Sequence, residues 1–237
     1  MKILALESSA QAASAALAVD GRVVAEAWQK TGLTHSETLL PMAVHLLETA
    51  KTKLSEIDLF AVANGPGSFT GLRIGVAAVK GLALGLGKPC AGISTLYGMY
   101  RACAPYPEGA LAVCTMDARV GQVYCAAFDP ASDTRSMPDR AMALDALREE
   151  LRALHRPVFL VGDGAEVTYA ALKDLTDEGI RVTLAPEQTR YQRASGVALA
   201  AAELSPDAYV SAGALRTEYH RLPQAERERL ERLKADK

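Results

Sequence analysis

The amino-acid sequence predicts an α/β protein of two related lobes, each a mixed sheet flanked by helices. Short apolar segments of strand length alternate with longer segments in which apolar residues recur at helical spacing. One order of elements, a strand, a turn and a strand that ends at an aspartate, begins at residue 3 and again at residue 110. A proline- and glycine-rich segment, 104–109, lies between the two copies and is typical of a domain boundary.

We therefore expect a first lobe over residues 1–104 and a second over 105–237, with the last helices returning to pack on the first lobe. With 237 residues, 49% of them hydrophobic, the chain can bury a substantial core. The net charge of −2 gives no overall indication of a nucleic acid or a membrane surface as partner.

The predicted location is the cytoplasm, without membrane contact. The N-terminus lacks the long apolar segment of a signal peptide, and the longest apolar segment, 72–86, is too short to span a bilayer. The four cysteines form no Cys-x-x-Cys pair, which favours buried free thiols in a reducing compartment over zinc binding or redox chemistry.

The first lobe opens with three antiparallel strands, because Asp20-Gly21 between apolar segments is typical of a hairpin. Ser and Thr residues before helical patterns predict where helices begin. The expected elements are strands over 2–8, 12–19 and 22–29, a helix over 34–52, a strand over 58–63, a helix over 70–86, an edge strand over 88–93 and a helix over 94–104.

The second lobe repeats the opening pair of strands and then alternates helices and strands. The expected elements are strands over 110–116 and 122–128, a polar loop over 130–140, a helix over 144–154, a strand over 157–161, a helix over 166–176, a strand over 180–184 and a helix over 194–204. The charged tail from Gln224 is expected to form a solvated helix.

A glycine-rich corner over residues 62–75 connects the predicted strand 58–63 to the helix 70–86. Ser68 or Thr70 is a natural N-cap, and free N–H groups together with the helix dipole favour an anion there. The alternative is a tight packing corner. Since the P-loop Lys-Ser/Thr pair and the third Rossmann glycine are absent, we favour the packing corner. A secondary anion contact would use Ser68, Thr70, Arg73 and Arg119.

The helix over 70–86 is apolar nearly all round, which predicts burial on more than one side. Its glycines at four-residue spacing allow another helix to approach closely. Either a partner protein or other elements of this chain can supply the second cover, and the sequence leaves both open.

Several motifs resemble those of TsaB, a family of bacterial tRNA threonylcarbamoyladenosine biosynthesis proteins. They are the corner Asn64-Gly65-Pro66-Gly67-Ser68-Phe69-Thr70-Gly71-Leu72-Arg73-Ile74-Gly75, Asp117-Ala118-Arg119, and the segments 3–9, 35–41 and 92–96. The resemblance is strong over residues 1–130 and weaker over 155–222. It departs near the C-terminus, where the family's Tyr-Leu-Arg is present only as Leu215-Arg216 after Ala214.

The resemblance implies an actin-like ATPase (ASKHA) fold and a non-catalytic subunit required for N6-threonylcarbamoyladenosine formation at the tRNA adenosine 3′ of the anticodon. Such a subunit binds and activates the transferase TsaD, and the ATPase TsaE joins the complex. Alone, the chain is expected to form a homodimer, and tRNA is bound only through the complex. No cofactor is expected to bind tightly, and ATP or ADP at the partner interface remains open.

The resemblance also suggests which residues matter. The metal-binding His-x-x-x-His pair of TsaD-type proteins is missing, because Leu39 stands four residues after His35, and no metal or catalytic residue is assigned. The expected partner interface uses the helices 35–51 and 70–86. Its candidate residues are His35, Leu39, Met42, Leu46, Arg73, Val76, Val79, Lys80 and Leu84.

Glu7, Asp117 and Arg119 stand where actin-like ATPases hold phosphate and Mg²⁺, but the turns around them lack the glycines that such sites use. We expect these three residues to form a structural ion pair across the cleft. The alternative function is an independent actin-like ATP-dependent kinase or hydrolase. A direct tRNA-binding module is a third hypothesis, which the charge balance and the 5% aromatic content disfavour.

Overall fold

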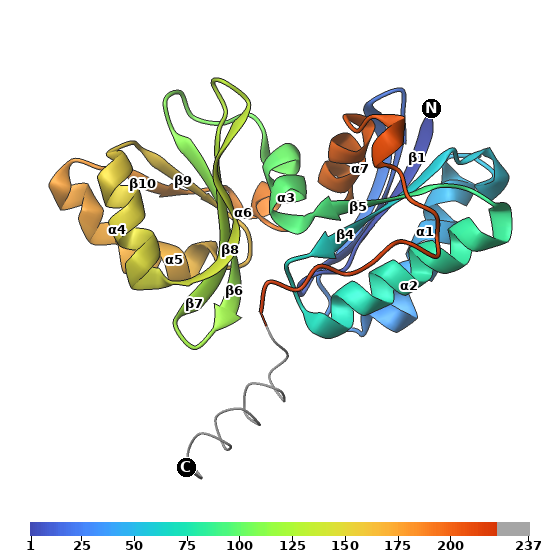
Figure 1. The fold of residues 1–237 in the computed structure, drawn as a ribbon, viewed down its shortest axis with the longest axis horizontal. Helices are drawn as coiled ribbons and strands as arrows, with labels where there is room; N and C mark the ends of the chain where they lie inside the picture. Colours follow the sequence, from blue (N-terminus) through green and yellow to red (C-terminus); the bar gives the residue numbers. More distant parts are fainter. Residues whose placement is uncertain (222–237) are drawn as a thin grey trace, which may run out of the picture.

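The computed structural model describes residues 1–221, which form two lobes side by side, each built on a five-stranded sheet (Figure 1). The helix predicted from Gln224 lies outside the described residues. The position of the lobe boundary at residue 104 stays a prediction.

The first sheet has the strand order β3-β2-β1-β4-β5. Its first three strands are antiparallel, as predicted, and β4 and β5 run parallel to β1. The strands are β1 (Lys2–Glu7), β2 (Ala13–Val19), β3 (Arg22–Gln29), β4 (Leu59–Gly65) and β5 (Cys90–Ser94).

The second sheet has the order β10-β9-β6-β7-β8, which is the same arrangement of three antiparallel strands followed by two parallel ones. This repetition confirms the predicted duplication. The strands are β6 (Leu111–Arg119), β7 (Gln122–Asp129), β8 (Thr134–Ala143), β9 (Val158–Val161) and β10 (Val182–Leu184).

The prediction of a polar loop over 130–140 was wrong, because most of this segment belongs to strand β8. The strand lies at the edge of the sheet and buries Met137, whereas Thr134, Arg135 and Ser136 are exposed. Polar residues are usual on an exposed edge strand, where they discourage pairing with another chain. The composition that suggested a loop therefore reflects the edge position.

The helices form layers on both sheets (Figure 1). Helices α1 and α2 cover the outer face of the first sheet, α3 and α7 fill the space between the sheets, and α4 and α5 cover the outer face of the second. The bounds are α1 (His35–Thr49), α2 (Phe69–Leu86), α3 (Thr95–Cys103), α4 (Leu144–Leu154), α5 (Ala165–Leu172), α6 (Glu187–Arg190) and α7 (Ala194–Ala202). Short 3₁₀ turns are η1 (Leu54–Glu56), η2 (Lys173–Glu178) and η3 (Pro206–Ala208).

Helix α2 begins as the sequence predicts, with the Ser68 hydroxyl accepting a hydrogen bond from the Gly71 N–H at 3.3 Å. The helix has 18 residues and is long and apolar enough to cross a bilayer, so the apolar segment 72–86 underestimated the length of the apolar helix. One face, which includes Leu72, Val79 and Ala83, is buried against the first sheet. The helix is thus a covering layer of the first lobe.

After α7 the chain forms a C-terminal strap (residues 209–221) along the first lobe, drawn in red in Figure 1. Val210 and Cys90 exchange two backbone hydrogen bonds, which place the start of the strap beside the edge strand β5. Leu215 is buried in the core beneath α2. The far end reaches the turn between β6 and β7, where the Arg221 guanidinium donates to the Ala118 carbonyl.

The four cysteines are buried and unpaired with one another, as predicted. Burial raises the pKa of each thiol, most strongly that of Cys114. A thiol kept protonated in this way is a poor nucleophile.

Candidate functional site

The glycine-rich corner is filled by the turn that follows β1. The Ser9 carbonyl accepts a hydrogen bond from the Ser68 N–H at 2.7 Å, and the Ser8 hydroxyl donates to the Gly71 carbonyl at 2.9 Å. A Cβ on Gly71 would lie 2.0 Å from the Ser8 carbonyl oxygen, so a side chain there could not be accommodated. The N–H groups of Ser68 and Gly71 are thus engaged within the chain and not free to cradle a phosphate.

The two lobes meet at a hollow of about 400 Å³ beside this corner. The first lobe contributes Ser68 and Thr70, and the second contributes Asp117, Arg119 and Asp163. Three of the four residues proposed for an anion contact therefore lie together, and the fourth, Arg73, is not among the lining residues. That an anion binds there stays a prediction.

Glu7 is 1% exposed at the end of β1, and its Oε1 accepts a hydrogen bond from the Ser9 N–H at 2.5 Å. Burial raises the pKa of Glu7 to about 7, and the negative charge of Asp163 across the cleft adds to the shift. The carboxyl group is therefore half protonated near neutral pH, and no ion pair joins it to a cation within residues 1–221.

The predicted ion pair among Glu7, Asp117 and Arg119 was wrong. The Asp117 carboxylate accepts from the backbone N–H of Arg119 at 2.7 Å within the β6–β7 turn, and the Arg119 guanidinium is exposed there. Glu7 is enclosed by its own turn instead, so the cleft separates these groups. Within the described residues, no group of three His, Cys, Asp or Glu side chains is arranged to hold a metal ion.

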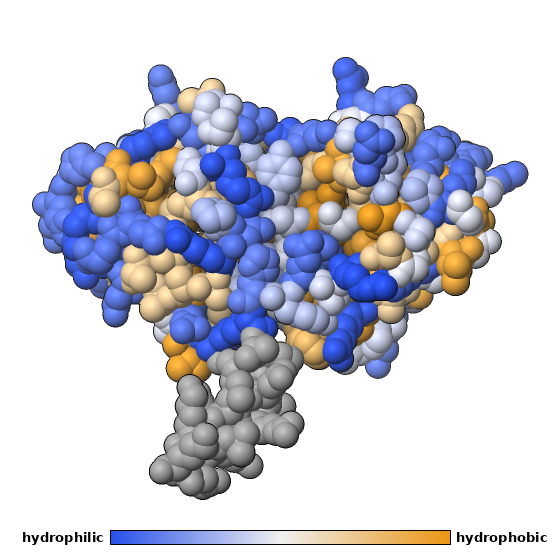
Figure 2. Space-filling model, viewed as in Figure 1, coloured by the Kyte–Doolittle hydropathy of each residue, from blue (hydrophilic) through white to orange (hydrophobic). Residues whose placement is uncertain are grey.

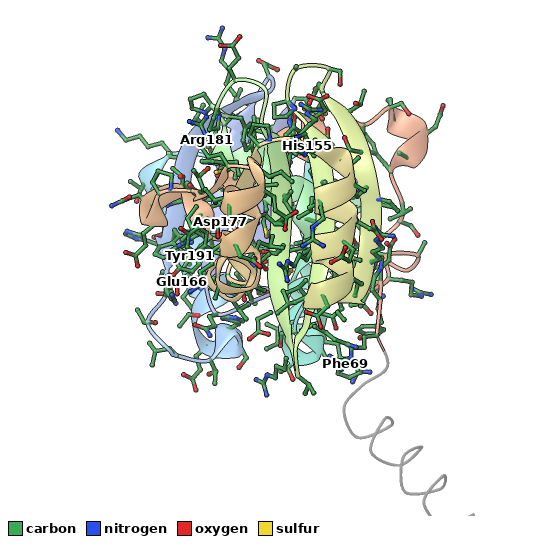
Figure 3. All side chains as sticks on the ribbon, turned by 90° about the vertical axis from the view of Figure 1, so that its left-hand side faces the viewer. Phe69, His155, Glu166, Asp177, Arg181 and Tyr191 are labelled. Carbon is green, nitrogen blue, oxygen red and sulfur yellow. The ribbon has the colours of Figure 1, made fainter. Side chains whose placement is uncertain are left out.

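A second, smaller hollow of about 180 Å³ lies further along the cleft, and its residues were not predicted. Arg190 is buried and pairs with Glu166 at 2.9 Å, and the Lys30 ammonium lies 3.9 Å from the Tyr191 ring centre. Figure 3 shows Glu166 and Tyr191 at the same edge of the molecule. These residues come from separate segments of the chain, so no local sequence pattern could have predicted that they meet.

Burial also raises the pKa of Asp163, and a hydrogen bond from the Gln192 side chain at 2.6 Å partly opposes this. Asp163 lines both hollows, so it connects them. Burial therefore favours the protonated forms of two carboxyl groups, Asp163 at the wall of the cleft and Glu7 behind the turn that follows β1.

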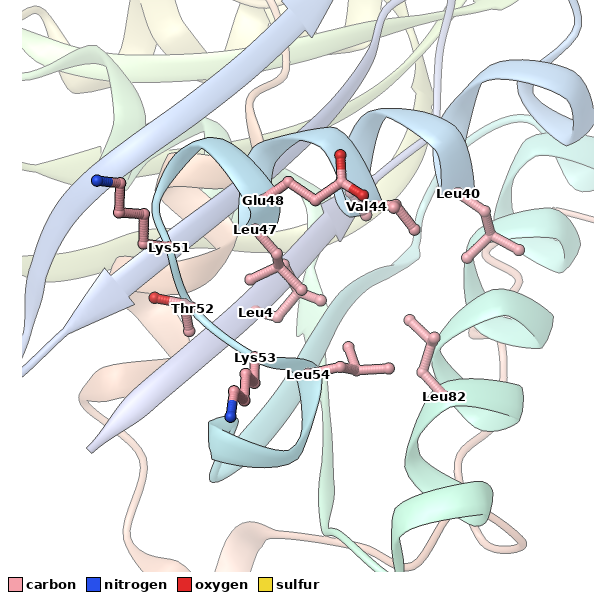
Figure 4. Close-up of a pocket in the computed structure, with 11 residues that line it drawn as sticks. Leu4, Leu40, Val44, Leu47, Glu48, Lys51, Thr52, Lys53, Leu54 and Leu82 are labelled. Atoms are coloured by element: carbon pink, nitrogen blue, oxygen red, sulfur yellow. The ribbon is translucent and has the colours of Figure 1, made fainter.

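Outside the cleft, α1 and α2 lie side by side and leave an apolar groove of about 540 Å³ between them (Figure 4). Leu40, Val44, Leu54 and Leu82 line it, with charged groups such as Glu48 at the rim. We refer to this groove together with the exposed face of α2 as the α1–α2 surface.

The α1–α2 surface exposes large apolar side chains to solvent. Leu40 is 40% exposed, Val44 53% and Leu84 75%. The glycines of α2 divide between its two faces: a Cβ on Gly75 would lie 2.5 Å from the Ser8 hydroxyl, whereas a Cβ on Gly81 would meet no atom within 4 Å. Gly85 is equally open. The helix thus offers a flat strip of backbone beside Leu84.

Four of the nine residues proposed for a partner interface do not reach this surface. Leu39, Leu46, Val76 and Val79 are buried against the first sheet, so we remove them from the proposed interface. The sequence could not show this, because a helix that is apolar all round does not reveal which face points inward.

The other five interface candidates are at least partly accessible. Leu84 and Arg73 are exposed, and Met42 is half-buried. His35 is half-buried, with its Nε2 2.7 Å from the Ala10 carbonyl oxygen, and Lys80 donates to the Leu215 carbonyl of the strap at 3.3 Å. Their contact with a partner stays a prediction.

Comparison with known proteins gives a family match over most of the chain. The family model described as "TsaD: tRNA N6-adenosine threonylcarbamoyltransferase" matches residues 27–203. The Escherichia coli protein named tRNA threonylcarbamoyladenosine biosynthesis protein TsaB is 39% identical over 128 residues, which are 54% of this chain and 55% of that protein. The Bacillus subtilis protein of the same name is 30% identical over 177 residues, 74% of this chain and 76% of that protein.

The matched region spans about half the length of the first curated relatives, 55% of the Escherichia coli protein and 52% of the Haemophilus influenzae protein. A solved structure from Pseudomonas aeruginosa, described as an uncharacterized protein with similarity to peptidase YEAZ, superposes with a TM-score of 0.76. It covers 93% of this chain and 99% of that chain at 23% identity. The likeness confirms the predicted two-lobed α/β fold.

Proposed function

The chain belongs to the TsaB family of tRNA threonylcarbamoyladenosine biosynthesis proteins, and from this premise we propose that it acts in N6-threonylcarbamoyladenosine formation as a non-catalytic subunit. In this proposal it binds and activates a TsaD-like transferase in the cytoplasm. A TsaE-like ATPase joins the complex, and tRNA is held by the assembled complex.

The observation that supports this proposal is the α1–α2 surface. Large apolar side chains on two adjacent helices are unfavourable in water, and contiguous exposed apolar patches are typical of protein interfaces. Leu84 lies beside the open strip at Gly81 and Gly85, where a helix from a partner can approach the α2 backbone closely. The groove beside Leu40 and Val44 can accept side chains from such a helix.

The same surface explains why we expect self-association of the isolated chain. A two-fold dimer buries the same patch on both copies, so a surface that fits a structurally related partner can also pair with itself. The transferase should compete with this homodimer, because both would cover Leu40, Val44 and Leu84.

The geometry of the cleft supports a role without chemistry. The turn after β1, which would hold phosphate in an actin-like ATPase, is bonded to the glycine corner through Ser8 and Ser9. Glu7 is buried, and its Oε1 is engaged by the Ser9 N–H of its own turn. ATP or ADP at the partner interface remains part of the proposal, since Arg73 lies beside the start of α2.

The alternative function is an independent ATP-dependent kinase or hydrolase. The 400 Å³ hollow with Asp117 at its wall is the feature that favours it. ATP turnover by the isolated chain that is lost in Asp117→Ala would support this alternative and count against a non-catalytic subunit.

Gel filtration with light scattering tests the proposal. We expect the chain and a TsaD-like transferase to elute together as a complex, in runs with and without ATP, and the homodimer to decrease as transferase is added. Separate elution under both conditions would contradict the proposal.

A further inference from the structure

Three arginines lie where the end of the strap meets the cleft: Arg73, Arg119 and Arg221. None of the three has a carboxylate partner within residues 1–221. Elsewhere eight arginines form ion pairs with Asp or Glu: Arg101, Arg135, Arg140, Arg148, Arg152, Arg156, Arg190 and Arg193. Arg22, Arg181 and Arg216 also form no ion pair within residues 1–221, so the distinguishing feature of this region is that three unpaired guanidinium groups lie near one another.

Two aromatic rings lie among these arginines. The Phe69 and Tyr219 rings are stacked with centroids 4.6 Å apart, and the Arg73 guanidinium lies 3.7 Å from the Phe69 centroid. The Arg73 Nε also donates to the Tyr219 hydroxyl at 3.1 Å. We call these two rings and the three arginines the arginine patch. Phe69 lies at the lower rim of the molecule in Figure 3.

Backbone contacts hold the strap firmly in this position. The Glu218 N–H donates to the Asn64 carbonyl at 2.7 Å, and the Asn64 side chain donates to the Arg216 carbonyl at 3.2 Å. The strap passes so close to β4 that a Cβ on Gly65 would lie 2.0 Å from the Glu218 carbonyl oxygen. Tyr219, 42% exposed, is therefore presented from a fixed backbone.

The arginine patch joins the two lobes. Arg221 donates to the carbonyl of Ala118, next to Arg119 in the β6–β7 turn, and Phe69 and Arg119 line the same hollow. The carboxylates of this region are Asp117, Asp163 and Glu218. Asp117 accepts from a backbone N–H and Asp163 from the Gln192 side chain, and neither accepts from an arginine side chain. Figure 2 shows hydrophilic residues along the middle of this face, between the more apolar areas of the lobes.

Guanidinium groups bind phosphate through paired hydrogen bonds, and exposed rings and guanidinium planes stack on unpaired bases. An arginine cluster with a stacked aromatic pair suits a ligand that carries both phosphates and bases. We propose that the arginine patch binds a single-stranded segment of RNA. The net charge of −2 is an average over the whole chain and does not describe this patch, because the acidic residues that pair with arginines lie elsewhere.

This inference rests on the proposed function only for the source of the RNA, a tRNA loop. The patch would contribute to holding tRNA in the complex, and its contact with a single-stranded segment can be measured on the isolated chain. Phe69 and Arg73 stand at the start of α2, whereas Leu84 stands near its end and Leu40 and Val44 on α1, so variants of one set test it independently of the other.

The test is fluorescence anisotropy with the isolated chain and a labelled single-stranded RNA of about 10 nucleotides. We expect binding that weakens with salt, with a slope of log affinity against log salt of about −2, the value for roughly three phosphate contacts to a single strand. Arg73→Ala combined with Arg221→Ala should lower the affinity about tenfold, since two phosphate contacts are lost. The matched control is Arg148→Ala combined with Arg152→Ala on α4, which should leave the affinity unchanged.

Substitutions at Tyr219 distinguish the contribution of stacking to the affinity from that of charge. Tyr219→Leu should weaken binding about fivefold, and Tyr219→Phe should retain most of the affinity because it keeps the ring. Leu84→Glu should bind RNA as the unaltered chain does. Equal urea midpoints for all variants show that the fold is retained.

Several results would overturn the inference. Absence of binding at low salt would do so, as would an equal loss of affinity in the α4 control. Displacement of the RNA by equimolar ATP would indicate a mononucleotide site instead. Equally tight binding of polyglutamate would indicate an acidic protein partner.

Discussion

The buried carboxyl group of Glu7 makes stability depend on pH in a predictable direction. Its pKa is raised from an ordinary value of 4.5 to about 7 in the folded chain. Between these two values the folded chain binds more protons than the unfolded chain, so the free energy of unfolding falls as the pH rises. The stabilisation is fully present below pH 4.5 and is lost as the pH rises through about 7.

The size of this effect follows from the shift. At about 1.4 kcal/mol for each pKa unit, the loss attributable to Glu7 is about 3 kcal/mol between pH 4.5 and pH 8. Glu7→Gln keeps an oxygen to accept the Ser9 N–H and cannot ionise. We therefore expect Glu7→Gln to be more stable than the unaltered chain at pH 8, by about 3 kcal/mol, and close to it at pH 4.5.

Urea unfolding followed by circular dichroism, at pH values from 4.5 to 8, measures this difference. The pKa of Asp163 is also raised, so Asp163 lowers the free energy of unfolding with rising pH in both proteins alike. Subtracting one stability curve from the other therefore leaves the contribution of Glu7. Glu48→Gln, an exposed position on α1, serves as control and should follow the unaltered chain. Parallel curves for Glu7→Gln and the unaltered chain across this pH range would refute the reasoning.

Two further predictions concern packing and thiol reactivity. A Cβ at Gly196 of α7 would lie 1.9 Å from the Gly98 carbonyl of α3, so Gly196→Ala should lower the free energy of unfolding by about 2 kcal/mol, measured by urea unfolding. Gly81→Ala, where the added Cβ meets open space, should instead raise it by about 0.5–1 kcal/mol in the monomer; a loss comparable to that at Gly196 would contradict the assigned contacts. The four cysteines should react with a thiol reagent only in the unfolded chain, because burial raises their pKa values; rapid labelling of the native chain would show that they are accessible.

The sequence predicts those parts of the fold that local patterns determine. Alternating apolar residues with Asp20-Gly21 at the turn require a hairpin, and Ser68 before an apolar helical segment marks the start of α2. The repeated order of elements showed the two related lobes. Strand β8 was missed because an edge strand such as Thr134–Ala143 needs few apolar residues.

The candidate site was less accessible to prediction because it depends on which side chains meet. The uniform apolar character of α2 concealed that Val76 faces the sheet and Leu84 faces solvent. Burial of Glu7 results from the turn folding over it, and the arginine patch exists because the strap brings Tyr219 to Phe69 from 150 residues further along the chain. Such contacts leave no periodic signal in the sequence.

We expect the α1–α2 surface to bind a TsaD-like transferase, and titration calorimetry with Leu84→Glu measures how much this surface contributes to the affinity. Burial of a leucine contributes about 1.5–3 kcal/mol, so loss of Leu84 and insertion of a charge should weaken the complex at least about 30-fold. Val167→Glu, an exposed position on α5 of the second lobe, should bind as the unaltered chain does. A Leu84→Glu protein that is folded and binds the transferase as tightly as the unaltered chain would contradict the account.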